Sequence, residues 1–90
     1  MLDKKKFYIN GKWVAPSKPN DLDVIDPCTE DSVATISLGS KEDTNAAISA
    51  AKTAFESWKE SSKEERVALL EKLLTIYKKR YSEMVDAISL

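Results

Sequence analysis

The hydrophobic positions change their spacing once along the chain. Before Gly39 they occur in short runs separated by turn residues, a pattern typical of β-strands. After it they recur every three or four residues, which is typical of amphipathic α-helices. We therefore expect an α/β fold, with two β-hairpins within residues 7–38, a first helix over 41–59 and a second helix over 63–90.

The pair Asn10-Gly11 gives the strongest turn signal in the first part of the chain. It separates two short apolar runs, and both residues adopt positive φ values at little cost, which favours a two-residue type I′ turn. A second turn is expected over residues 27–31, between extended segments over 22–26 and 32–38. The later segment is predicted to place Ala34, Ile36 and Leu38 on one face.

Two serines followed three residues later by an acidic residue mark the expected helix starts. They are Ser40 with Asp43 and Ser62 with Glu65, each at the spacing of a capping box. The second helix carries a wide apolar stripe, which we expect to be buried on two sides. Its members are Val67, Leu70, Leu74, Tyr77, Tyr81, Met84 and Ile88. No helix-terminating residue follows this stripe, so the fold is expected to continue beyond residue 90.

The composition excludes several kinds of site. Ninety residues with 14 Lys and Arg against 15 Asp and Glu carry a formal net charge of -1, which provides no field for nucleic acid or anionic lipid. The absence of histidine excludes Ser-His and Cys-His catalytic pairs. A single cysteine allows no internal disulfide and favours a reducing compartment, the cytoplasm. No stretch of eighteen apolar residues occurs, so neither a membrane span nor secretion is expected.

A cysteine and two pairs of acidic residues are candidates for catalysis. Cys28 could be a nucleophile, but nothing in the sequence can activate its thiol, so we favour a turn or packing residue. The pairs Glu42/Asp43 and Glu64/Glu65 could act as an acid–base dyad in a cleft. Both pairs fall in predicted first helical turns, where interaction with the helix dipole is the better explanation.

Charged and aromatic residues offer a further set of alternatives. Residues 78–80, Lys-Lys-Arg, could contact phosphate, but at helical spacing they belong to the solvated face, and Tyr77 and Tyr81 to the buried stripe. Trp13 and Trp58 could stack on a base or a cofactor ring, although such residues are more often part of the core. No glycine-rich phosphate loop is present, because the two glycines lie too far apart.

Several sequence blocks occur together in a distinctive order. They are FYINGKWV at 7–14, VIDPCTED at 24–31, VATI at 33–36, Asp43, the pairs Ala46-Ala47, Ala50-Ala51 and Ala54-Phe55, Trp58, Glu65-Arg66 and Leu69-Leu70. This succession closely resembles the amino-terminal segment of the NAD(P)-dependent aldehyde dehydrogenases, from about residue 7 to residue 90. The departures are Asp26 for a usual Asn, Cys28 for a small residue and Glu30-Asp31 for a frequent Gly-Glu. Family members are also several times longer.

The resemblance implies the amino-terminal part of a Rossmann-like cofactor domain, with residues 1–90 forming a single incomplete domain. The parent enzyme would oxidise an aldehyde to a carboxylic acid through a thiohemiacetal, hydride transfer to NAD or NADP, and thioester hydrolysis. The family's nucleophilic cysteine, general-base glutamate, oxyanion asparagine and cofactor-binding glycines have no counterparts here. We therefore expect no catalytic and no cofactor-binding residue in this chain, and the piece alone to be inactive.

The resemblance also implies partners and one cation site. Some family members bind a monovalent cation through backbone carbonyls that correspond to Val24 and Ile25. The expected partner is the remainder of an aldehyde dehydrogenase chain, in a homodimer or homotetramer, with no nucleic acid and no membrane. Two other interpretations are a self-contained helical binding or oligomerisation module, which would use the stripe of the second helix, and an amphipathic helix at a membrane surface.

Overall fold

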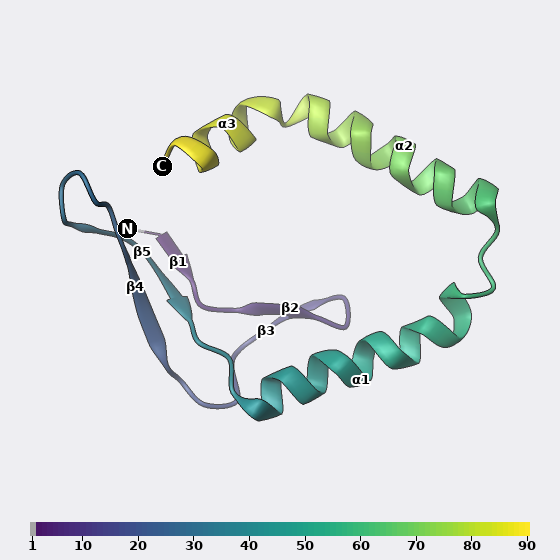
Figure 1. Cartoon of the computed structure of the whole chain (residues 1–90), viewed down its shortest axis with the longest axis horizontal. Coiled ribbons are helices and arrows are strands. Elements are labelled where there is room, and N and C mark those ends of the chain that lie inside the picture. Colours follow the sequence, from purple (N-terminus) through teal and green to yellow (C-terminus); the bar gives the residue numbers. More distant parts are fainter. Residues whose placement is uncertain (1) are drawn as a thin grey trace. The chain divides into compact units, whose positions relative to one another are not determined.

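A computed structural model describes residues 2–90 of the chain. These residues form five strands and three helices, so the α/β class is confirmed (Figure 1). The elements are β1 (Leu2–Lys4), β2 (Phe7–Ile9), β3 (Lys12–Val14), β4 (Asp21–Ile25), β5 (Ser32–Ser37), α1 (Lys41–Trp58), α2 (Lys63–Lys79) and α3 (Tyr81–Ser89). The chain divides into one compact unit that ends at Glu56 and a second from Ser57 to Leu90.

The first unit is built around β5, the central strand of a three-stranded sheet in the order β1-β5-β4. Strand β4 pairs with β5 antiparallel, as the predicted hairpin requires. Strand β1 pairs with β5 in parallel, with Leu2 opposite Ala34, and the Ser37 hydroxyl donates to the Lys5 carbonyl at 2.7 Å. The sequence did not predict β1, because its side chains are largely charged and its place in the sheet depends on backbone pairing with distant residues.

The buried part of this sheet is small. Ala34 is the one buried hydrophobic residue among residues 2–90, and Thr35 and Ser37 are equally buried, at 8% exposure each. Leu38, expected on the same face as Ala34 and Ile36, is 42% exposed. Burial in β5 therefore follows its central position between two strands rather than the apolar alternation of its sequence.

Strands β2 and β3 form the predicted hairpin. Phe7 pairs with Val14 and Ile9 with Lys12, which leaves Asn10 and Gly11 as the two turn residues. Their φ values of 55° and 75° are those that a type I′ turn requires, so this prediction is confirmed.

The turn between β4 and β5 is held by short-range hydrogen bonds. The carboxylate of Asp26 accepts the Cys28 amide at 2.8 Å, and the Asp26 amide donates to the Asp31 carbonyl at 2.9 Å. Glu30 takes a positive φ of 63°, as a tight reversal of the chain requires. The expected turn over residues 27–31 is therefore present.

Helix α1 starts with the predicted capping box. The Asp43 amide donates to the Ser40 hydroxyl oxygen at 3.3 Å, and the Ser40 amide donates back to the Asp43 carboxylate at 3.0 Å. Ser17, from the loop after β3, joins this cluster: its amide donates to Asp43 Oδ1 at 3.0 Å, and its hydroxyl lies 2.7 Å from that of Ser40. The loop is thereby tied to the start of the helix.

The second unit begins with the turn between α1 and α2. Ser62 caps α2 by accepting the Glu65 amide at 3.1 Å, as the sequence predicts. Arg66 reaches back across the turn, where its Nε donates to the Ser61 hydroxyl at 2.8 Å and its Nη2 to the Trp58 carbonyl at 3.3 Å. Its guanidinium also lies 5.4 Å from the centre of the Trp58 ring.

The helix predicted over 63–90 is interrupted at Arg80, where α2 ends and α3 begins. Arg80 has φ −103° and ψ 21°, and its amide is shared between the carbonyls of Ile76 and Tyr77 at 3.0 and 3.2 Å. The sequence gives no sign of this interruption because neither glycine nor proline occurs there. The prediction of one continuous helix is therefore corrected to two helices.

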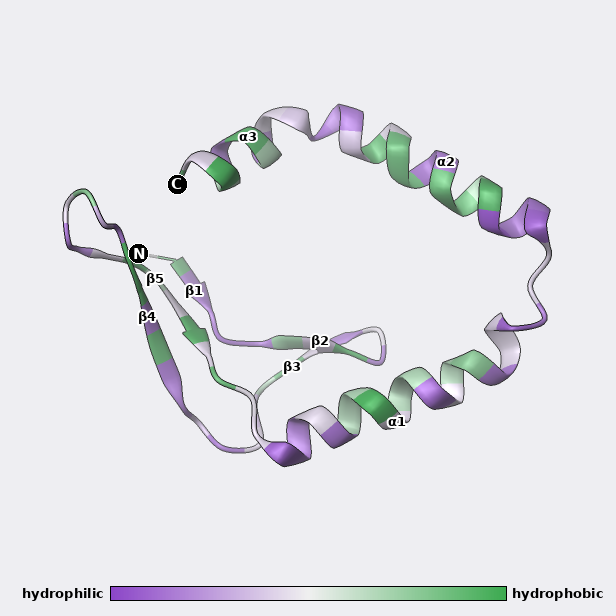
Figure 2. Ribbon diagram, in the orientation of Figure 1, coloured by the Kyte–Doolittle hydropathy of each residue, from purple (hydrophilic) through white to green (hydrophobic). Residues whose placement is uncertain are grey.

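Hydrophobic residues recur along α2 and α3 (Figure 2). This apolar stripe is not buried within its own unit. Leu70 is 63% exposed and Leu74 53%. Trp13 and Trp58, predicted as core residues, are 67% and 46% exposed. These expectations of burial are wrong for this chain, because neither unit has a second layer among its described residues that could cover these side chains.

Candidate functional site

The structure does not assemble a catalytic group around Cys28. Its thiol is free and exposed in the β4–β5 turn. Within residues 2–90, no group of three or more His, Cys, Asp or Glu side chains is placed to hold a metal ion. Cys28 therefore lies in the turn that the sequence predicted for it.

The paired carboxylates lie where the sequence placed them. Glu42 and Asp43 are in the first turn of α1, and Glu64 and Glu65 in the first turn of α2. Backbone hydrogen bonds from Ser40 and Ser17 hold the pKa of Asp43 below its ordinary value. A lowered pKa suits a carboxylate that caps a helix, whereas a general acid requires a raised one.

The junction of β5 and α1 resembles the place where a dinucleotide's phosphates bind in other folds. It has the right order of elements, a strand, a glycine (Gly39) and a helix start, at which backbone amides bind anions. The Asp43 carboxylate already accepts the amides of Ser40 and Ser17, however, and would repel a phosphate. A phosphate at this junction would therefore meet a carboxylate.

The residues expected at a cation site lie near the end of β4. Val24 is opposite Ala34 and Ile25 opposite Ser32, so the register shifts between them. Such a bulge disturbs the hydrogen-bonded ladder locally and can turn a carbonyl away from it. Two carbonyl oxygens supply only part of the oxygen shell that a hard cation takes. The cation site expected at Val24 and Ile25 therefore stays a prediction.

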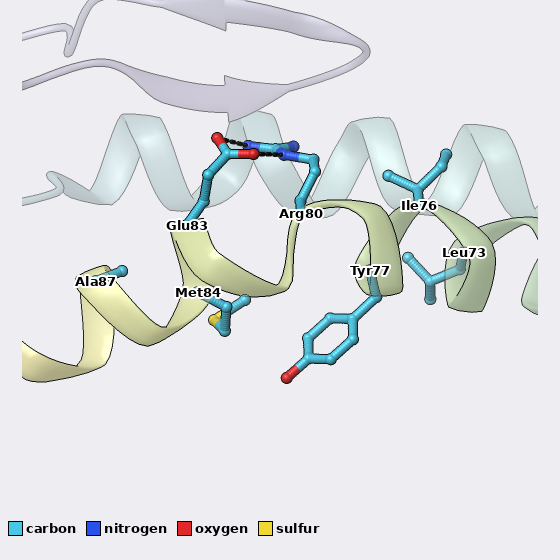
Figure 3. A pocket seen from close by; sticks show the side chains of 7 residues that line it. All are labelled: Leu73, Ile76, Tyr77, Arg80, Glu83, Met84 and Ala87. Atoms are coloured by element: carbon cyan, nitrogen blue, oxygen red, sulfur yellow. Dashed lines mark hydrogen bonds and ion pairs between the residues drawn. The ribbon is translucent and has the colours of Figure 1, made fainter.

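A shallow hollow of about 300 Å³ lies where α2 meets α3 (Figure 3). Arg80 and Glu83 face each other there, with Arg80 Nε 2.9 Å and Nη2 3.3 Å from the two carboxylate oxygens of Glu83. Tyr77 and Met84 project to another side of the helices, next to Leu73. The hollow is mainly apolar with one ion pair, so it suits packing against another apolar surface rather than catalysis.

The basic residues at the end of α2 have ordinary structural roles. Lys78 and Lys79 occupy its last turn, where cations interact favourably with the helix dipole. The ion pair with Glu83 raises the pKa of Arg80 and lowers that of Glu83, chiefly through their side-chain hydrogen bonds. Tyr77 and Tyr81 make an edge-to-face contact at 6.2 Å but are 44% and 60% exposed, so their predicted burial is wrong for this chain.

Among the described residues, no helix is both long enough and apolar enough to cross a lipid bilayer. The interrupted and charged helices α2 and α3 explain this result, because each carries ionisable side chains along its length.

Comparison with known proteins identifies the kind of protein to which these elements belong. The sequence profile of the aldehyde dehydrogenase family matches residues 13–90. The chain belongs to the aldehyde dehydrogenase family. A relative named 3-succinoylsemialdehyde-pyridine dehydrogenase, from a Pseudomonas species, is 39% identical over 89 residues. This aldehyde dehydrogenase chain is also similar to the crystal structure of an aldehyde dehydrogenase from Bartonella henselae, with a TM-score of 0.97 and 57% identity.

Each match covers nearly all of this chain but only a small part of the related protein. The alignment with the Pseudomonas relative covers 99% of this chain but 19% of the relative. The alignment with the Bartonella structure covers 100% of this chain and 19% of that one. This aldehyde dehydrogenase chain therefore spans about a fifth of the length of its relatives.

Two side-chain contacts of this aldehyde dehydrogenase segment were not predicted from the sequence. One is the contact of Arg66 with Trp58 and Ser61, and the other is the ion pair of Arg80 with Glu83. The i,i+3 spacing of Arg80 and Glu83 is a usable signal for the second. The Arg66 contact has no such signal, because it spans a turn whose shape must be known first.

Proposed function

We propose that this chain is the amino-terminal scaffold of a longer NAD(P)-dependent aldehyde dehydrogenase and has no dehydrogenase activity alone. The observation that carries this proposal is the match of the whole chain to 19% of the Bartonella aldehyde dehydrogenase at a TM-score of 0.97. Residues 1–90 would then form one incomplete domain, the start of the Rossmann-like cofactor domain.

The chemistry of the proposed parent enzyme lies outside this segment. The parent converts an aldehyde to a carboxylic acid, with a cysteine that forms the thioester and NAD or NADP that accepts the hydride. In this proposal neither step uses a residue of this chain; Cys28 is a free, exposed thiol in the β4–β5 turn. The segment contributes to activity only by helping the rest of the enzyme to fold.

The exposed stripe of α2 and α3 is the surface that such a scaffold would use. Leu70, Leu74 and Met84 are 63%, 53% and 41% exposed in the chain. Full burial of a side chain of this size stabilises a fold by about 1.5–3 kcal/mol. Several such residues together would hold the segment firmly on the cofactor domain.

Three further features belong to the same proposal. The carbonyls of Val24 and Ile25 supply part of a monovalent-cation site that the remainder of the chain completes; the register shift between them supports this assignment. The parent is a homodimer or homotetramer. It works in the cytoplasm, where the single free cysteine stays reduced.

A chimeric enzyme tests the scaffold role directly. The matching amino-terminal segment of the Bartonella enzyme is replaced by this chain, and aldehyde-dependent formation of NADH and NADPH is measured over a panel of aliphatic and aromatic aldehydes. We expect activity within about tenfold of the parent enzyme, since the two segments share one backbone geometry.

Controls separate the scaffold from its alternatives. The Bartonella enzyme lacking this segment should be inactive, and so should the isolated 90-residue chain. Turnover by the isolated chain, or a folded chimera of native size without activity, would contradict the proposal. A sharp dimer with cooperative unfolding of the isolated chain would instead favour a self-contained oligomerisation module.

A further inference from the structure

The tip of the β2–β3 hairpin combines several conditions for a spontaneous chemical reaction. Asn10 and Gly11 are exposed and form the whole turn. Within residues 2–90, neither the Asn10 side chain nor the Gly11 amide takes part in a hydrogen bond or ion pair. A Cβ atom added to Gly11 would meet nothing within 4 Å, so no neighbouring group crowds Gly11 on that side.

We propose that Asn10 is a deamidation site of this chain and converts to a mixture of aspartate and isoaspartate. The main-chain nitrogen of Gly11, after loss of its proton, attacks the side-chain carbonyl carbon Cγ of Asn10. A bond forms between that nitrogen and Cγ, the bond from Cγ to the amide nitrogen Nδ2 breaks, and ammonia leaves with the proton. Water then opens the five-membered succinimide at one of its two carbonyls, and no redox partner is needed.

The other two asparagines of the chain are held in less favourable surroundings. Asn20 is followed by Asp21, whose side chain crowds the attacking nitrogen, and its carbonyl accepts the Leu38 amide at 2.7 Å. Asn45 lies within α1, where the amide of the next residue belongs to the helical ladder. Only Asn10 precedes a residue without a side chain, so Asn20 and Asn45 serve as internal controls.

The isoaspartate product would disturb the hairpin more than its added negative charge suggests. It inserts one extra methylene group into the main chain of a two-residue turn, whose geometry fixes the pairing of Ile9 with Lys12. Each strand of this hairpin has only three residues, so little pairing remains to resist the change. The contact between Tyr8 and Trp13, with ring centres 5.1 Å apart, depends on the same register.

The reaction is measured on the intact chain, incubated at neutral and at mildly alkaline pH and then digested with trypsin. The sequence places the three asparagines in separate peptides, 7–12, 13–41 and 42–52. Deamidation raises a peptide mass by about one dalton, and isoaspartate is distinguished from aspartate by its retention time. We expect conversion in peptide 7–12 to exceed that in the other two by about tenfold or more, and to accelerate at the higher pH.

Two variants complete the test. Asn10→Gly keeps a turn sequence that the hairpin accepts and should abolish the change in peptide 7–12. Asn10→Asp adds the charge without the extra methylene, and should keep the near-ultraviolet circular dichroism of Tyr8 and Trp13, which the isoaspartate form should lose. An unincubated sample, digested in parallel, corrects for conversion during digestion. Equal or faster conversion at Asn20 or Asn45, or no conversion at Asn10, would overturn the proposal.

Discussion

At the scale of single residues, Asp43 holds together more of the structure than its exposed position suggests. Its two carboxylate oxygens accept hydrogen bonds from Ser40 and from Ser17, which lies 26 residues earlier in the chain. The spacing of Ser40 and Asp43 was enough to predict the helix cap. The participation of Ser17 was not predictable, because a contact over that separation depends on the path of the intervening strands.

Acid should weaken this cluster in a defined pH range. Backbone hydrogen bonds from Ser40 and then Ser17 lower the pKa of Asp43 in the folded chain. A depressed folded-state pKa contributes stability that is present above the unfolded pKa and is lost as the pH falls through the folded value. We expect the side-chain carboxyl signal of Asp43 to titrate below the range of an ordinary aspartate, and amide exchange at the start of α1 to accelerate over the same pH interval.

The variant Asp43→Asn separates this titration from general acid effects. It keeps an acceptor oxygen but cannot ionise, so the acid dependence of exchange at the start of α1 should disappear. An unchanged acid dependence in Asp43→Asn, or an ordinary pKa for Asp43, would show that the cluster does not respond to this carboxylate.

At the scale of elements, the structure follows most local sequence signals. It departs from the prediction at one pairing of distant segments and at one interruption within a helix. The Asn10-Gly11 turn and the Ser62 cap were predictable, because each depends on residues within one turn of the chain. Strand β1 and the interruption at Arg80 were not. Strand β1 depends on its pairing with β5, some thirty positions away. The interruption depends on the Arg80 amide, which is shared between the carbonyls of Ile76 and Tyr77.

The turn between α1 and α2 should depend on the arginine character of residue 66. Arg66 uses two nitrogens at once, on Ser61 and on the Trp58 carbonyl, and also lies over the Trp58 ring. A lysine keeps the charge but cannot reproduce this fork. Arg66→Lys should therefore lower the free energy of opening of the turn by about 0.5–1.5 kcal/mol, the net value of a lost hydrogen bond, because a lysine can still lie over the Trp58 ring.

Hydrogen exchange at residues 62–66 measures this opening, and Trp58 fluorescence in a Trp13→Phe background reports on the ring itself. Lys63→Gln is the matched control, since it removes a cation from the start of α2 without touching Trp58. Equal exchange rates in Arg66→Lys and in the control would show that the fork does not stabilise the turn.

At the scale of the whole molecule, the contrast between a well-formed backbone and an almost absent core is the dominant feature. One hydrophobic residue is buried among residues 2–90, while the stripe along α2 and α3 remains exposed. The sequence predicted the stripe from its period, but the predicted two-sided burial is not found in this chain. The cation site expected at Val24 and Ile25 stays a prediction, because two backbone carbonyls supply only part of the oxygen shell that a hard cation takes.

The same substitution should have opposite effects in the isolated chain and in the chimera. Leu70→Lys combined with Leu74→Lys removes two exposed apolar side chains, so the isolated chain should bind less hydrophobic dye and associate less in light scattering. In the chimera, the proposed scaffold role would bury these positions against the enzyme. There the pair should cost at least about 3 kcal/mol of lost burial and abolish activity.

Lys72→Gln serves as the control, because residue 72 lies on the opposite side of α2 from Leu70 and Leu74. It should leave dye binding by the isolated chain and activity of the chimera unchanged. A chimera that stays fully active with both lysines would show that the stripe of α2 is not a packing surface in the enzyme.

The parallel pairing of β1 with β5 has a consequence for the order in which the chain assembles during synthesis. Strand β1 is made well before residues 34–36, with which it pairs, whereas the β2–β3 hairpin can close as soon as Val14 is available. Pairings between distant segments form later than local ones, because a long loop must first be closed. The growing polypeptide should therefore carry β1 as an unpaired strand through the first stage of translation, and a fusion partner placed directly before it should slow completion of the sheet without affecting the hairpin.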